Sequence, residues 1–70
     1  MTREDLQRLF ALACEVHGRE PTTIRLLTNE GGWLVDTVGL DLRDDCILGK
    51  SGQRTVCLLW PAITGFVLND

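Results

Sequence analysis

Three cysteines and one histidine are the side chains of this sequence best suited to metal binding or nucleophilic chemistry. Cys14, Cys46 and Cys57 form no Cys-x-x-Cys pair, and none has a second ligand at the spacing of a zinc site. Their odd number does not favour a disulfide framework either. His17 is most simply a cation near the end of a helix or a surface residue. We therefore expect the cysteines to be small buried hydrophobic residues in a reducing compartment.

Catalysis finds little support among the remaining polar residues. Ser51 is the only serine, there is no tyrosine, and we find neither a nucleophile–base pair nor a glycine-rich phosphate loop. Four aspartates could chelate a metal ion, but turn and edge-strand positions explain them without one. These four are Asp36, Asp41, Asp44 and Asp45. We expect no enzyme activity, no metal and no cofactor.

Aromatic and basic side chains offer binding chemistry instead. Trp60 could stack on a nucleobase, because such stacking contributes about 1–3 kcal/mol per base in any sequence, or it could pack in a subunit interface. Trp33 follows a pair of glycines and is expected to pack. Arg25 could contact a phosphate, although a solvated or salt-bridged arginine is the default. Three further arginines could form a basic rim around a symmetric ring: Arg3, Arg8 and Arg19.

The charge balance restricts the class of partner. The chain has a formal net charge of −3 and a pI of about 4.9, which argues against non-specific binding of nucleic acid. No apolar run approaches the roughly 20 residues of a membrane span, and the N-terminus begins with polar and charged residues. We expect a soluble, cytoplasmic protein with no membrane partner.

Residues 3–17 are typical of one amphipathic helix. Thr2 can cap its first turn, and Asp5 stands three positions later, where a capping box places an acidic residue. Gly18 and Pro21 then end the helix in the usual order. The apolar stripe recurs at helical spacing. It comprises Leu6, Leu9, Phe10, Ala13 and either Val16 or His17.

Beyond Pro21 the apolar pattern changes to the period of a β-strand. Five short antiparallel strands are predicted at 22–28, 33–42, 46–50, 54–60 and 62–68, separated by turn-forming residues. Gly39 is a predicted bend or bulge within the second strand. The chain is therefore expected to be a single, mostly β domain over 1–70 with one N-terminal helix.

The last two strands meet at Pro61, which has no N–H and cannot lie within a central strand. Apolar residues occupy both faces of strand 54–60, so neither face is plainly meant for water. A chain of 70 residues buries only roughly 60% of its unfolded surface and is marginally stable by itself, so this pattern favours oligomerisation. The expected subunit interface comprises Val56, Cys57, Leu58, Leu59, Ile63, Phe66 and Val67.

These motifs, in this order, resemble the Sm-like superfamily, and in particular the bacterial RNA chaperone Hfq and its relatives. The resemblance covers nearly the whole chain. Leu6-Gln7, Phe10 and Ala13 are similar to the helix pattern L-Q-x-x-F-x-x-A. In the strands, the similar segments are Pro21-Thr-Thr-Ile-Arg-Leu26 with Asn29 and Gly31, Cys46-Ile-Leu48, and Trp60-Pro-Ala-Ile-Thr64.

The resemblance implies a strongly bent, five-stranded antiparallel small barrel that assembles into a homo-oligomeric ring. In such rings the fourth strand of one subunit pairs with the fifth strand of the next, which removes exposed sheet edges. A hexamer, a heptamer or a smaller ring would bury the same edges. The resemblance also implies binding of single-stranded RNA. The corresponding residues here are Gln7, Arg25, Asn29, Asp44 and Trp60.

Departures from the family pattern weaken the RNA assignment. The pore-facing Lys-His pair becomes Trp60-Pro61, the base-holding Gln-Phe pair falls at about Asp44-Asp45, and a stacking aromatic becomes Arg25. Two functions therefore stay open. The first is a ring-forming, non-catalytic RNA-binding protein; the second is an Sm-like or SH3-like module that binds protein. The Leu12-Ala-Cys-x-x-His17 run resembles the Rho-terminator inhibitor family, whose members bind protein.

Overall fold

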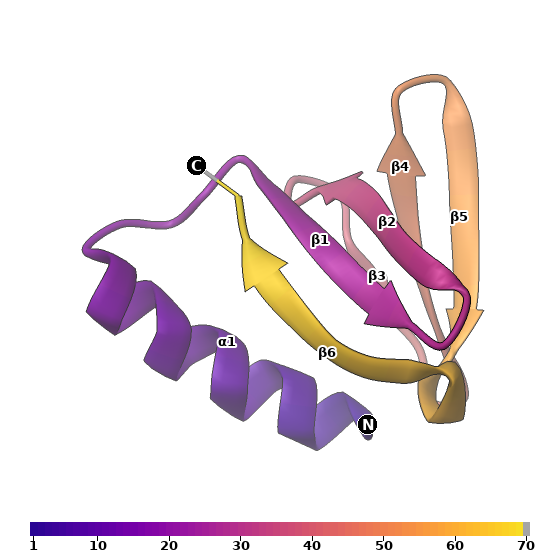
Figure 1. The fold of residues 1–70 in the computed structure, drawn as a ribbon, viewed down its shortest axis with the longest axis horizontal. Coiled ribbons are helices and arrows are strands. Elements are labelled where there is room, and N and C mark those ends of the chain that lie inside the picture. Colours follow the sequence, from indigo (N-terminus) through magenta and orange to yellow (C-terminus); the bar gives the residue numbers. More distant parts are fainter. Residues whose placement is uncertain (70) are drawn as a thin grey trace.

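The computed structural model describes residues 1–69 and shows one N-terminal helix followed by β-strands (Figure 1). The strands form two small antiparallel sheets of three strands each. The elements are α1 (Arg3–His17), β1 (Thr23–Thr28), β2 (Gly31–Asp36), β3 (Asp41–Leu42), β4 (Cys46–Ser51), β5 (Arg54–Leu59), the 3-10 turn η1 (Trp60–Ala62) and β6 (Ile63–Leu68).

Local signals in the sequence place both ends of α1. The backbone N–H of Asp5 donates to the Thr2 hydroxyl at 3.1 Å, and the N–H of Thr2 donates to the Asp5 carboxylate at 3.4 Å. This capping box provides acceptors for two backbone N–H groups that have no hydrogen-bond partner within the helix itself. At the other end Gly18 adopts a left-handed conformation (φ 89°) and its N–H donates to the carbonyl of Cys14. The helix therefore has the bounds expected from the sequence.

The first sheet has the strand order β2-β1-β6. Ile24 and Leu26 of β1 and Val35 of β2 point to the buried face. The opposite face carries a cross-strand row in which Arg25 lies between Leu34 of β2 and Val67 of β6. The alternation of buried and exposed residues along β1 follows the two-residue period of a strand.

The expectation of one continuous strand over 33–42 is wrong. The segment is divided into β2 and β3, because the chain turns between Thr37 and Leu40, where Gly39 adopts a positive φ of 84°. The N–H of Leu40 donates to the carbonyl of Thr37, and the Thr37 hydroxyl donates to the carbonyl of Pro21 at 2.7 Å. These bonds hold the turn against the segment that precedes β1.

The second sheet has the strand order β3-β4-β5 and packs against the first. Gly49 of β4 is buried between them; a Cβ there would lie 3.0 Å from Cδ2 of Leu40 and 3.4 Å from Cβ of Val35. Within residues 1–69 the two sheets do not join into a closed barrel. The structure thus confirms a small, mostly β fold with one N-terminal helix. It does not confirm the five-stranded barrel that the resemblance implies, since six strands form two separate sheets.

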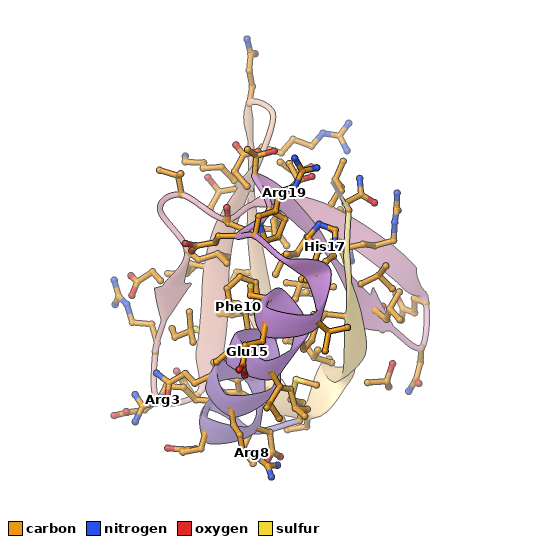
Figure 2. The ribbon with its side chains drawn as sticks, turned by 90° about the vertical axis from the view of Figure 1, so that its left-hand side faces the viewer. Arg3, Arg8, Phe10, Glu15, His17 and Arg19 are labelled. Carbon is orange, nitrogen blue, oxygen red and sulfur yellow. The ribbon has the colours of Figure 1, made fainter. Side chains whose placement is uncertain are left out.

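Helix α1 lies in front of both sheets when the molecule is viewed from its side (Figure 2). Leu6 enters the core, and the ring of Phe10 lies 6.2 Å from that of Phe66 on β6. Part of the expected apolar stripe is exposed, namely Leu9 and Val16, and so is Leu12, which lies outside that stripe. Among the described residues, no helix has the length and apolar character needed to cross a membrane.

Candidate functional site

Trp60 lies in the core of the subunit rather than at an open stacking position. Its side chain is only 5% exposed, and its indole Nε1–H donates to the carbonyl oxygen of Arg43 at 2.9 Å. A nucleobase could not stack on this ring without its removal from the core. The indole follows the short η1 turn into the core, so Trp60 offers no open stacking face in this subunit, and the prediction that it contacts RNA stays untested.

The other residues expected to contact RNA do not form one site. Gln7 is exposed on α1, Arg25 is on the outer face of β1, and Asn29 is in the β1–β2 turn. The aliphatic part of Arg25 lies over Gly32, where an added Cβ would be 3.0 Å from the Cγ and Cδ atoms of the arginine. Each of these residues thus faces a different part of the surface.

The arginines near the ends of α1 do not form a shared basic surface, because two of them make ion pairs and the third lies at the opposite end of the helix. Arg3 Nη1 donates to Asp44 Oδ1 at 2.8 Å, which joins the start of the helix to the loop before β4. Arg8 pairs with Asp5 at 3.2 Å. Arg3 and Arg8 lie at one end of the helix and Arg19 at the other (Figure 2). These three arginines do not gather into a basic patch within one subunit.

The residues expected at a subunit interface fall into two groups. Val56 and Ile63 belong to the core of their own subunit, and Leu58 and Phe66 pack against that core. These four side chains therefore stabilise the single subunit. Cys57, Leu59 and Val67 are exposed, with Leu59 60% and Val67 48% accessible. The exposed group occupies β5 and β6, the two strands on either side of the Pro61 corner.

β5 and β6 are also the strands with unpaired edges on either side of that corner. Within the described chain β5 pairs only with β4, and β6 pairs only with β1. An edge strand presents a row of backbone N–H and C=O groups that can pair with another chain. The two edges therefore offer a donor–acceptor surface flanked by exposed apolar side chains.

A groove of about 490 Å³ lies between β2 and β5. Trp33 lines it from β2 with 41% of its surface exposed, and Arg54, Thr55 and Cys57 line it from β5. Sequence reasoning expected Trp33 to pack and did not single out Arg54. The tandem glycines before Trp33, which carry no side chains of their own, are the signal that could have marked this position.

A second concavity, smaller and more apolar, lies between α1 and the β2–β3 turn. Its volume is about 270 Å³, and its walls are mainly aliphatic and aromatic. The lining residues are Leu6, Gln7, Phe10, Glu20, Ile24, Thr37, Leu40 and Leu42. Gln7 is the only residue of the expected RNA set that contributes to either concavity.

The expectation that all three cysteines are buried is wrong: Cys57 is exposed on β5, and Cys14 and Cys46 are half-buried. Cys46 and Cys57 lie on the same face of β4 and β5, as diagonal neighbours across the Leu48–Cys57 pair. Burial raises the pKa of the Cys46 thiol to about 11, with further contributions from the neighbouring Cys57 thiol and from Asp45. Cys46 is therefore a poor nucleophile. No group of three or more potential metal ligands occurs among residues 1–69.

Comparisons with protein-family models, with curated proteins and with solved structures found no match for this chain.

Proposed function

We propose that this chain is a non-catalytic binding module of the Sm-like type that assembles through the edges of β5 and β6 and binds protein. The strand orders β2-β1-β6 and β3-β4-β5 support the Sm-like assignment. If β2 and β3 are the two halves of one sharply bent strand, the order becomes that of a five-stranded barrel open between its fourth and fifth strands.

The observation that carries the proposal is the pair of unpaired edges at the Pro61 corner. Leu59 is exposed at the end of β5 and Val67 is exposed near the end of β6. Pairing of β5 from one subunit with β6 from the next would satisfy both edges and cover both side chains. Since each subunit carries both edges, the contact is head-to-tail, and the assembly that we propose is a closed ring of six, seven or fewer subunits rather than an open filament.

Surface chemistry favours protein over RNA as the ligand. The net charge of −3 opposes the approach of a phosphate backbone. Apolar side chains are exposed on the helix as well as on the strands, with Leu12 and Val16 on α1 and Leu34 on β2. Exposed apolar groups beside acidic residues suit a partner protein that has an apolar patch and a basic rim.

Light scattering during gel filtration tests the assembly. We expect the wild-type chain to elute at several times its 7.8 kDa mass and a Leu59→Lys/Val67→Lys double variant to elute as a monomer. Val38→Lys is the matched control, because Val38 is 85% exposed in the β2–β3 turn and belongs to neither edge. A wild-type monomer at micromolar concentration would reject assembly through these edges.

The groove at Trp33 supports single-stranded RNA as the second candidate ligand. Trp33 and Arg54 both line this groove, so one concavity offers an indole for stacking and a guanidinium for phosphate contact. Titration of oligo(U) and oligo(A) at low salt, followed by tryptophan fluorescence, tests it with Trp33→Leu and Arg54→Gln. Because Trp60 is buried, a quench that Trp33→Leu abolishes would support RNA binding at the groove. No binding at about 10 μM would leave protein as the ligand, since phosphate contacts are strongest at low salt.

A further inference from the structure

The concavity between α1 and the β2–β3 turn is open to solvent and has a volume of about 270 Å³. Leu6 and Ile24, which belong to the hydrophobic core, border it, so the concavity reaches the core from the surface. None of its lining residues comes from β5 or β6, so the space is separate from the strand edges.

The walls of this pocket are apolar on three sides. Leu6 and Phe10 come from α1, Ile24 comes from β1, and Leu40 and Leu42 come from the β2–β3 turn and from β3. An apolar cavity of about 150 Å³ can admit benzene. The pocket of about 270 Å³ therefore has room for one aromatic ring and a short aliphatic chain.

Few polar groups line the pocket, and the only charged one among them is the carboxylate of Glu20. The Thr37 hydroxyl donates its proton to the carbonyl of Pro21 at 2.7 Å, and the amide of Gln7 and the carboxylate of Glu20 are the other polar side-chain groups on the residues that line the pocket. The charge of Glu20 contributes, after burial, to the raised pKa of the Cys14 thiol on α1. Glu20 also precedes the buried Pro21, which restricts its backbone to extended conformations.

We propose that this pocket binds a small molecule composed of an aromatic or aliphatic body and a primary ammonium group. The body fills the space between Phe10 and Leu42, and the ammonium lies at the carboxylate of Glu20 with the Gln7 carbonyl as a further acceptor. An anionic head group is disfavoured, because Glu20 is the only charged residue that lines the pocket. Binding at this site depends neither on assembly nor on the identity of the protein partner.

Three probes of similar size test the chemistry: 2-phenylethylamine, 2-phenylethanol and 3-phenylpropanoate. Binding is measured on the full chain by two-dimensional amide NMR, with signals of Leu40 and Leu42 as reporters of the pocket. We expect the amine to bind with a Kd on the order of 1 mM, as a small ligand with few atoms can. It should bind roughly threefold more tightly than the alcohol, the gain of a partly exposed ion pair, and the carboxylate most weakly.

Two variants at the mouth of the pocket separate its apolar and charged parts without altering the core. Gln7→Phe narrows the opening and should weaken all three probes, whereas Glu20→Gln should remove only the preference for the amine. Glu15→Gln is the control, since Glu15 points away from the sheets on the exposed side of α1 (Figure 2). Circular dichroism of each variant verifies that the fold is retained.

The following outcomes would overturn the proposal. Equal affinity for the three probes, or an amine preference that survives Glu20→Gln, excludes recognition of the ammonium by Glu20. Shifts that spread over the surface and leave Leu40 and Leu42 unchanged exclude the pocket as the site. Binding that Gln7→Phe leaves unchanged also excludes the pocket as the binding site.

Discussion

The indole Nε1–H of Trp60 donates to the carbonyl oxygen of Arg43 across 17 positions of the sequence, at a distance of 2.9 Å. This bond joins the corner between β5 and β6 to the loop that leads into β4. The backbone N–H of Trp60 also donates to the carbonyl of Asp45, at 3.3 Å. Trp60 therefore fastens the Pro61 corner to the second sheet.

Loss of that indole bond should destabilise the domain. Trp60→Phe keeps most of the buried ring but leaves the Arg43 carbonyl without its donor, which should lower the free energy of unfolding by about 1–2 kcal/mol. Trp33→Phe is the control, because Trp33 is partly exposed, and it should change stability by less than about 0.5 kcal/mol. Urea titration followed by circular dichroism measures both. Equal effects of the two variants would contradict the assigned role of Trp60.

The capping box should contribute measurably to stability. Thr2→Ala removes the acceptor of the Asp5 N–H and should cost about 1 kcal/mol, while Thr2→Ser retains the hydroxyl and should cost little. Thermal unfolding at neutral pH compares the two variants. If Thr2→Ser proves as unstable as Thr2→Ala, the hydroxyl is not the stabilising group.

Asp5 should also make the domain less stable in acid. Hydrogen bonds from Thr2, and secondarily the charge of Arg8, hold the pKa of Asp5 below its ordinary value of 3.8. Because the folded-state pKa is the lower one, this stabilisation is complete above about pH 4 and is lost as the pH falls through the depressed pKa. Asp5→Asn should therefore reduce the slope of stability against pH below pH 4. An unchanged slope would show that other carboxylates cause the acid sensitivity.

Two strand glycines should respond in opposite ways to the same substitution. Gly49→Ala places a methyl group 3.4 Å from the Cβ of Val35 and 3.0 Å from Leu40 Cδ2, so we expect a loss of about 1–3 kcal/mol from overpacking. Gly65→Ala on β6 meets only Leu27 Cδ1, at 3.8 Å. It should be neutral or raise stability by up to about 1 kcal/mol, because glycine loses more entropy on folding. Denaturant titration at equal protein concentration distinguishes the two.

Thiol alkylation should distinguish Cys46 from Cys57. At pH 8 iodoacetamide should modify exposed Cys57 before Cys46, whose pKa is raised to about 11 mainly by burial. The rate at Cys46 should then rise about tenfold per pH unit towards pH 10. In Cys57→Ser the pKa of Cys46 should fall but stay above its ordinary value of 9.0, because burial remains. Mass spectrometry of the alkylated peptides gives both rates.

Much of the secondary structure could be predicted because its signals act locally. Thr2, Asp5 and Gly18 delimit α1 through bonds within a few residues, and Pro61 ends β5 because it cannot donate in a strand ladder. The sequence pattern does not predict the division of strand 33–42, although it predicts a bend or bulge at Gly39. Whether such a bend interrupts pairing depends on Thr37 and its bond to Pro21, which are distant in the sequence.

The candidate sites were less predictable than the elements that carry them. The sequence predicts Gln7 as an RNA contact, yet its position at an apolar pocket shared with Leu40 and Leu42 depends on where α1 packs. The groove at Trp33 likewise arises only where β2 approaches β5. Neither concavity has a sequence motif, because residues from separate elements form its walls.

By itself the sequence determined the helix, the approximate strand positions and the sharp corner at Pro61, since capping, glycine and proline conformations are set by near neighbours. It also determined a surplus of apolar residues on the last two strands. Only the tertiary structure decided which of them are buried. Trp60 and Val56 are inside and Leu59 and Val67 are outside, because the packing of two sheets, not the order of residues, selects the face that meets the core.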